Sequence, residues 1–252
     1  MISLGCLSSG FNYYSKLLMM TLLPIGICGL LMLVGVVSRK RRGVCFTLML
    51  VVTYAVLPSV STTIFGSFPC DTTDVGEYLI ADYSINCDEG AYDLYAVYSG
   101  FAIILYPIGI PLLYTLLLWG KRGAIMEEVE KREKNEALAG MEFLFDNYKP
   151  EYWYFEVVVT ALRLMLTGIL GLIEPGSSTQ LCVGMLISFG AVITVNTLRP
   201  YESESDNKLS VLSYVQIFLV MVCGLVLKSQ DVVEDNSFDK ENLGIVLISV
   251  NV

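Results

Sequence analysis

Three observations predict an all-α, polytopic membrane protein. Of the 252 residues, 54% are hydrophobic and only 16% are charged. The mean hydropathy is +0.62, which lies above the range of ordinary globular domains. Apolar runs of about 20 residues recur, and that length lets a helix cross a hydrocarbon core of about 30 Å. Because soluble helices would show a polar stripe, we expect a single membrane domain over residues 1–252.

Six segments are long and apolar enough to span a bilayer. They are residues 17–38, 44–66, 92–119, 152–173, 179–198 and 209–227. The apolar stretch 244–252 is too short to span, and we interpret it as the start of a candidate seventh helix. Residues 121–149 combine helix formers with oppositely charged pairs such as Glu127 and Lys131. This pattern predicts a cytosolic helical segment, either a partner or gating element or a solvated connector.

The distribution of charge predicts the orientation. Residues 39–42 are all basic, and Lys121 and Arg122 follow the third segment. The loop 67–91 contains six acidic residues and neither lysine nor arginine. Since basic loops stay in the cytosol, we expect the N-terminus and the acidic loop outside. The first segment lacks the features of a cleaved signal peptide, which favours an uncleaved anchor, and a larger preceding ectodomain is compatible with this orientation.

Two cysteines, Cys70 and Cys87, flank the acidic outer loop. A disulfide is expected there because that face is oxidising in secretory membranes, with free thiols as the alternative. The loop does not have the spacing of an EF-hand. It is either a solvated loop or a surface that raises the local cation concentration. The chain has no histidine and no CxxC pair, so neither a metal site nor a cofactor is expected.

Two prolines interrupt the third segment in the sequence ILYPIGIPLLY. Pro107 and Pro111 are four residues apart, with Gly109 between them. Each proline removes a helical hydrogen bond and clashes with the preceding turn. A kink is therefore expected, serving either as a hinge or ion-coordinating break or as a static feature of packing.

A charged residue lies deep in the fourth segment. Arg163 comes about ten residues after the aromatic belt at 152–155, which places it near mid-membrane. An arginine there costs about 2.5–3.5 kcal/mol on insertion scales, so it needs a partner. The candidates are Glu156, seven residues earlier on the same helix face, and Asn196, Gln216, Tyr54 and the carbonyls freed by the prolines. Arg163 either links helices structurally or acts in permeation, gating or ligand binding.

The second half of the chain resembles a known family. The runs FLFDNYKPEYWYFEVVVTALRLMLTGILGL and LRPYESESDNKLSVLSYVQIFLV are similar to the C-terminal membrane domain of TRP-like channel proteins, the polycystin-related or flavin-carrier-type family of fungi and protists. The resemblance covers about residues 142–228. The residues that carry it are Tyr148, Pro150, Trp153, Arg163, Gln180, Arg199, Pro200, Tyr201 and Asn207. The upstream half resembles membrane regions of large surface proteins of algae and oomycetes.

The resemblance implies cation transport or sensing in the plasma membrane or a secretory-pathway membrane. The implied partners are the lipid bilayer, cations, and a homo-oligomer or larger membrane complex. However, only about ten residues, on the cytosolic side, separate the fifth segment from the sixth, which leaves no room for an outer pore loop. A non-conducting anchor or accessory subunit is therefore the alternative, and a seven-helix receptor is a third reading. No nucleophile–base pair or phosphate loop suggests an enzyme, and no basic face suggests nucleic-acid binding.

Overall fold

A computed structural model describes residues 12–74, 76–127, 135, 138–173 and 176–232. Within this part of the chain, six helices are long and apolar enough to cross a membrane. The all-α, polytopic prediction is thus confirmed, and the protein is an integral membrane protein. The candidate seventh helix at 244–252 and the middle of the predicted cytosolic helix, 128–134 with 136–137, lie outside the described residues.

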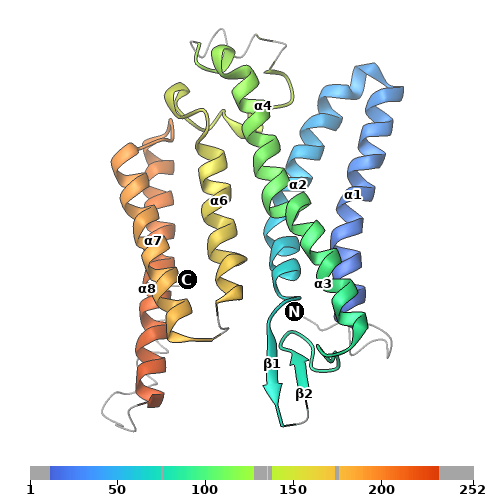
Figure 1. Cartoon of the computed structure of the whole chain (residues 1–252). Helices are drawn as coiled ribbons and strands as arrows, with labels where there is room; N and C mark the ends of the chain where they lie inside the picture. Colours follow the sequence, from blue (N-terminus) through green and yellow to red (C-terminus); the bar gives the residue numbers. More distant parts are fainter. Residues whose placement is uncertain (1–11, 75, 128–134, 136–137, 174–175, 233–252) are drawn as a thin grey trace. The chain divides into compact units, whose positions relative to one another are not determined.

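The chain divides into two compact units (Figure 1). The first comprises residues 1–146 and 150–172, and the second comprises 147–149 and 173–252. The helices of the first unit are α1 (Tyr13–Val37), α2 (Arg42–Phe65), α3 (Gly90–Ile103), α4 (Gly109–Ile125) and α6 (Phe155–Thr167). The second unit contains α7 (Ser178–Leu198) and α8 (Glu204–Val232), which pack against each other.

The helix boundaries in the first unit follow local chemistry. At α1, the Asn12 side chain accepts a hydrogen bond from the Ser15 backbone N–H at 3.1 Å, as an N-cap should. A short turn at Arg39–Arg41 joins α1 to α2, and the two helices pack side by side (Figure 1). Pro150 does not begin α6 directly. It opens a 3₁₀ turn at Pro150–Tyr152, and α6 starts at Phe155.

The core of the first unit joins the membrane helices to the segment that follows the charged loop. Leu17 of α1, Ile64 of α2 and Tyr114 of α4 are fully buried within one cluster. Leu144 and Phe145, from the segment after residue 140, belong to the same cluster. The apolar stretch beyond the charged residues is therefore packed into this unit rather than solvated.

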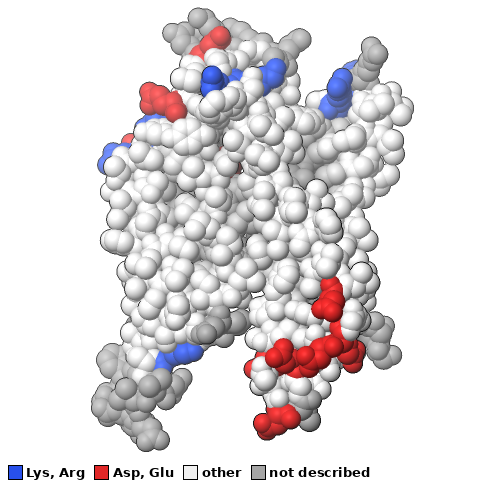
Figure 2. All heavy atoms as spheres, viewed as in Figure 1, with Lys and Arg blue, Asp and Glu red and all other residues white. Residues whose placement is uncertain are grey.

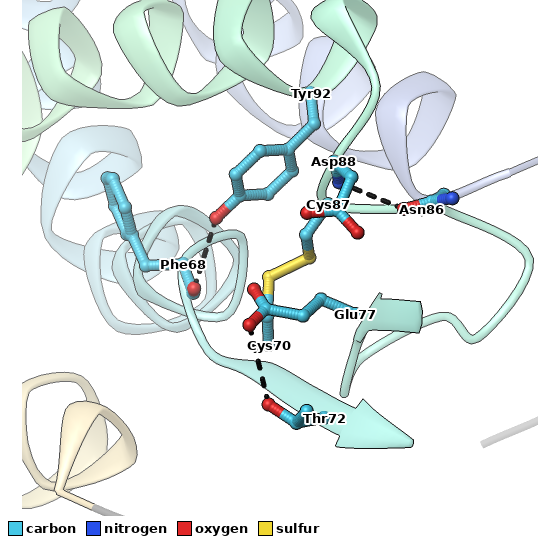
Figure 3. Close-up of a disulfide and its surroundings, with 8 residues drawn as sticks. All are labelled: Phe68, Cys70, Thr72, Glu77, Asn86, Cys87, Asp88 and Tyr92. Atoms are coloured by element: carbon cyan, nitrogen blue, oxygen red, sulfur yellow. Dashed lines mark hydrogen bonds between the residues drawn. A yellow bond between two sulfur atoms is a disulfide. The ribbon is translucent and has the colours of Figure 1, made fainter. Parts of the chain in front are cut away.

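The acidic loop 67–91 contains structure that the sequence analysis did not predict. Strands β1 (Cys70–Thr73) and β2 (Gly76–Leu79) form an antiparallel hairpin in which Cys70 pairs with Leu79. The predicted disulfide between Cys70 and Cys87 is present and ties β1 to the start of α3 (Figure 3). Tyr92 adds a second tie, because its hydroxyl donates to the Phe68 carbonyl at 3.1 Å.

Candidate functional site

Arg163 on α6 has a partner on α2. Its guanidinium donates a hydrogen bond of 2.6 Å to the Tyr54 hydroxyl and lies 4.5 Å from the centre of the Tyr54 ring. Tyr54 is held in turn by an edge-on contact with Phe143, with ring centroids 5.0 Å apart. One tyrosine therefore offers the arginine both a hydrogen-bond acceptor and a π face, two contacts that strengthen away from water.

Glu156 completes this arrangement. Its side chain is only 5% exposed, and it interacts electrostatically with the Tyr54 side chain. Arg163 and Glu156, seven residues apart, share one face of α6. Tyr54 thus contacts a positive and a negative group of the same helix, and we call these three residues the α2–α6 charge cluster. Because the cluster contains opposite charges, the free-energy cost of burying each charge is lower than it would be without the other.

Two other candidate partners of Arg163, Asn196 and Gln216, belong to the second unit. Asn196 is exposed on α7, and Gln216 is half-buried on α8. Of the partners that the sequence suggested, Tyr54 is the one that the structure places against Arg163 within the first unit. The functional roles of all these residues stay predictions.

The proline motif produces a defined interruption between α3 and α4. Residues Ile104–Ile108 form a π-helical turn that contains Pro107, and α4 restarts at Gly109. Pro111 then lies in the first turn of α4, directly after the π-helical turn. A Cβ atom on Gly109 would lie 2.9 Å from the Ile104 carbonyl oxygen, so glycine is required at this step.

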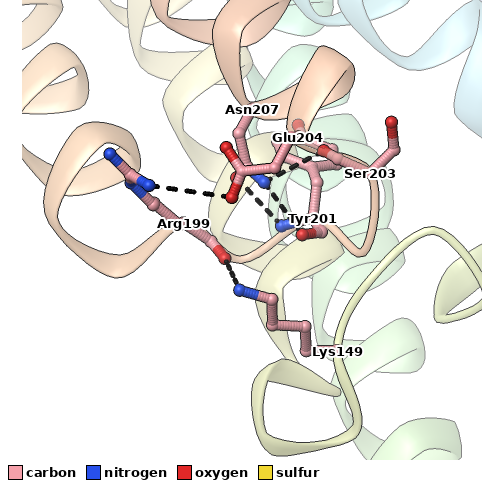
Figure 4. Close-up of polar contacts among 6 residues, drawn as sticks. All are labelled: Lys149, Arg199, Tyr201, Ser203, Glu204 and Asn207. Atoms are coloured by element: carbon pink, nitrogen blue, oxygen red, sulfur yellow. Dashed lines mark hydrogen bonds and ion pairs between the residues drawn. The ribbon is translucent and has the colours of Figure 1, made fainter.

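Four residues of the TRP-like motif meet in the second unit. Tyr148 pairs as an isolated β-bridge with Tyr201, and their ring centroids are 4.9 Å apart. The Lys149 backbone N–H donates to the Pro200 carbonyl, and the Lys149 ammonium donates to the Arg199 carbonyl at 2.8 Å (Figure 4). A segment 50 residues earlier thus holds the turn between α7 and α8.

Hydrogen bonds from its C-terminal side also hold the turn between α7 and α8. Asn207 is buried, accepts a hydrogen bond from the Tyr201 N–H and donates to the carbonyls of Tyr201 and Ser203 (Figure 4). Arg199 adopts a left-handed conformation with φ of 45°, which is uncommon for a residue with a Cβ, and lies 3.7 Å from Glu204. We call residues 147–149 and 199–207 the α7–α8 turn clamp.

The remaining motif residues lie elsewhere. Trp153 belongs to the first unit and makes an edge-on contact with Trp119, with centroids 6.0 Å apart. Gln180 lies in the first turn of α7, where its side chain accepts from the Gly176 N–H. The residues of the TRP-like motif therefore do not form a single site. They lie in the turn clamp, in an aromatic contact and at the start of a helix.

Acidic side chains gather over the hairpin and the start of α3 (Figure 2). The exposed acids there are Asp71, Asp74, Glu77, Asp88, Glu89 and Asp93. Among the described residues, no group of three or more His, Cys, Asp or Glu is arranged to hold a metal ion. The acidic surface thus provides a negative potential, without a defined coordination site in the described chain.

These features define a polytopic helical membrane protein with a charge cluster inside one helix pair. Residues 133–252 match the family model described as transient receptor potential (TRP) ion channel. The match supports, for this part of the chain, the resemblance to TRP-like membrane domains seen in the sequence. No curated protein and no solved structure matches the chain.

Sequence reasoning missed two parts of this arrangement. The hairpin carried a signal, since the stretch from Cys70 to Leu79 has β-branched and aromatic residues on either side of Gly76. No sequence signal indicated the pairing of residues 147–149 with the α7–α8 turn, because this pairing joins short segments that are distant in the chain. Tyr54 was among the partners suggested for Arg163, but one aromatic in an apolar run does not single itself out.

Proposed function

We propose that this TRP-like membrane domain transports cations or senses a stimulus through the helices that carry the α2–α6 charge cluster. The observation that carries the proposal is the interaction of the half-buried Arg163 and the buried Glu156 with Tyr54, in a chain whose C-terminal part matches a channel family. Ionisable groups inside membrane helices are costly and typically mark pathways for ions or protons.

The acidic surface of the hairpin supports the same proposal. Exposed carboxylates on one end of the first unit raise the local concentration of cations next to the membrane. The proline-containing interruption between α3 and α4 supplies a second element suited to movement, because π-helical turns often occur at functional sites.

Cation flux into proteoliposomes tests the proposal. The purified chain should conduct above protein-free vesicles, and Arg163→Leu should change that flux by about tenfold or more because it removes the charge from the cluster. The matched control is Lys121→Leu, which removes an exposed cation outside the cluster. Folded wild-type protein with no flux above Arg163→Leu would count against conduction.

A second candidate function is a non-conducting anchor or accessory subunit of a larger membrane complex. One observation favours it: only Arg199–Ser203 separate α7 from α8, and the α7–α8 turn clamp holds these residues. Five residues cannot form a pore loop with a filter of backbone carbonyls. This function predicts co-purification in a stable larger assembly from native membranes, together with absent flux. A conducting homo-oligomer in pure liposomes would exclude it.

A further inference from the structure

The first unit has an apolar groove where α1 and α2 approach the basic turn. It encloses about 700 Å³ and is lined by Met32 and Gly35 of α1, by Gly43 and Phe46 of α2, and by Arg42. The groove is thus apolar along its walls and carries a guanidinium at the end where α2 begins.

The groove continues along α1 towards the middle of the membrane. A second apolar cavity of about 310 Å³ shares Met32 with it and reaches Pro24 of α1 and Tyr106 beside the proline break. From Pro24 to Val36 is twelve residues of helix, or about 18 Å at 1.5 Å per residue. This length is close to one leaflet, half of a hydrocarbon core of about 30 Å.

The basic end of the groove has no protein partner in the described chain. Lys40, Arg41 and Arg42 are exposed and consecutive, and among the described residues none of them makes an ion pair. α2 begins at Arg42 with no side-chain cap, and the positive end of its helix dipole adds to the potential of the basic side chains. Cations at a helix N-terminus are unfavourable unless an anion neutralises them.

We propose that this groove binds an anionic phospholipid. The phosphate contacts Arg41 and Arg42 at the start of α2, and one acyl chain lies along α1 between Val36 and Pro24. A neutral lipid would fill the apolar walls equally well but would leave the basic turn uncompensated. Basic residues at a membrane surface attract anionic lipid with about 1 kcal/mol each, which is the charge complementarity that selects this occupant.

Retention of lipid by the full chain tests the proposal. The protein is reconstituted with equal amounts of phosphatidylserine and phosphatidylcholine carrying the same acyl chains, then extracted, and the retained lipids are counted by native mass spectrometry. The wild-type protein should retain phosphatidylserine in preference, and high salt should reduce the preference. Equal retention of both lipids would overturn the proposal, whatever the variants do.

Two variants locate the site. The double substitution Arg41→Gln with Arg42→Gln should reduce phosphatidylserine retention by on the order of tenfold. The matched control, Lys121→Gln with Arg122→Gln, removes two cations from the same end of the first unit outside the groove and should stay within about twofold of wild type. If both double variants lost phosphatidylserine equally, the retention would depend on general surface charge, and this result would contradict a specific site.

A third variant tests the acyl-chain groove without changing charge. A Cβ on Gly43 meets no atom within 4 Å, so Gly43→Leu is sterically allowed and fills the groove. It should lower the retention of phosphatidylserine severalfold, whereas Gly120→Leu, at an equally open position outside the groove, should not. Unchanged retention with Gly43→Leu would contradict an acyl chain in the groove. The measurement reads lipid occupancy alone and is independent of conduction.

Discussion

At the scale of single residues, the main question is how the bilayer tolerates Arg163. The residue that Arg163 contacts on a neighbouring helix is aromatic rather than acidic. The Tyr54 hydroxyl accepts from the guanidinium, and its ring lies beneath the same charge. Glu156 contacts the same tyrosine from α6. A tyrosine suits this position because it has an apolar body and a polar tip, so it packs in the helix interface and still hydrogen-bonds.

We expect Tyr54→Phe to destabilise the protein by about 1.5–3 kcal/mol, the range for a hydrogen bond to a charged group. The ring and its π contact with Arg163 remain, so the loss reports the hydroxyl alone. Thermal unfolding in detergent measures it, with Tyr154→Phe as the control, since the Tyr154 side chain is exposed. Equal stability of the two variants would show that the hydroxyl contributes nothing.

At the scale of elements, the proline break between α3 and α4 decides where a helix stops and restarts. Pro107 lies inside the π-helical turn and Pro111 lies in the first turn of α4, so the interruption coincides with the two residues that lack a backbone N–H. Gly109 makes the transition possible because a side chain there would strike the Ile104 carbonyl. Either a hinge or a static kink is consistent with this geometry.

Gly109→Ala should lower the thermal unfolding temperature, because its Cβ would lie 2.9 Å from a backbone oxygen that cannot move independently of the helix. Gly120→Ala is the matched control in the same helix. Nothing lies within 4 Å of its Cβ, and alanine favours helix by about 1 kcal/mol over glycine. The two variants should therefore shift stability in opposite directions, and a stabilised Gly109→Ala protein would contradict the contact.

The outer hairpin is tied to α1 by one carboxylate. Asp82 accepts a hydrogen bond of 2.9 Å from the Tyr13 backbone N–H at the start of α1, and its other oxygen accepts from Ser84. Burial tends to raise the pKa of this carboxyl, but the hydrogen bonds from Ser84 and Tyr13 outweigh burial and lower the pKa below its ordinary value of 3.8. The ionised form therefore stabilises the folded hairpin.

The sign of the pH effect follows from that lowered pKa. The stabilisation is fully present above the ordinary pKa and is lost as the pH falls through the lower folded value. We expect Asp82→Asn to unfold at a lower temperature than wild type at pH 6, with the difference shrinking below about pH 4. Asp74→Asn, at an exposed acid of the same loop, serves as the control. A difference independent of pH would contradict the role of the charge.

At the scale of the whole molecule, charge is separated along the first unit. Basic residues lie at the α1–α2 turn and at the end of α4, whereas acids gather over the hairpin (Figure 2). This separation agrees with the orientation predicted from the positive-inside rule, with the basic end in the cytosol.

Cysteine accessibility checks the orientation. In a background without free cysteines, Asp74→Cys should react with a membrane-impermeant maleimide in intact cells, whereas Lys121→Cys should react only after permeabilisation. The disulfide cysteines are retained, because a cross-link closing a loop of this length stabilises a protein by about 3 kcal/mol. The reverse labelling pattern would invert the topology.

The membrane helices and the disulfide were predictable because their signals are local. Runs of about 20 apolar residues have few alternatives in a bilayer, and Cys70 and Cys87 flank a loop without basic residues. Local signals also indicated the interruption at Pro107 and Pro111. The exact start of α6 was less predictable, because Pro150 fits a 3₁₀ turn as well as the first turn of a helix.

By itself, the sequence determined the polytopic membrane class, the segments that span, and the need of Arg163 for a partner, because each depends on the cost of placing polar groups in hydrocarbon. Only the tertiary structure decided that Tyr54 meets this need and that Tyr148 and Lys149 hold the turn at Arg199. These pairings depend on how helices rotate and pack, and residues 50 or more positions apart in the chain carry no periodic signal that links them.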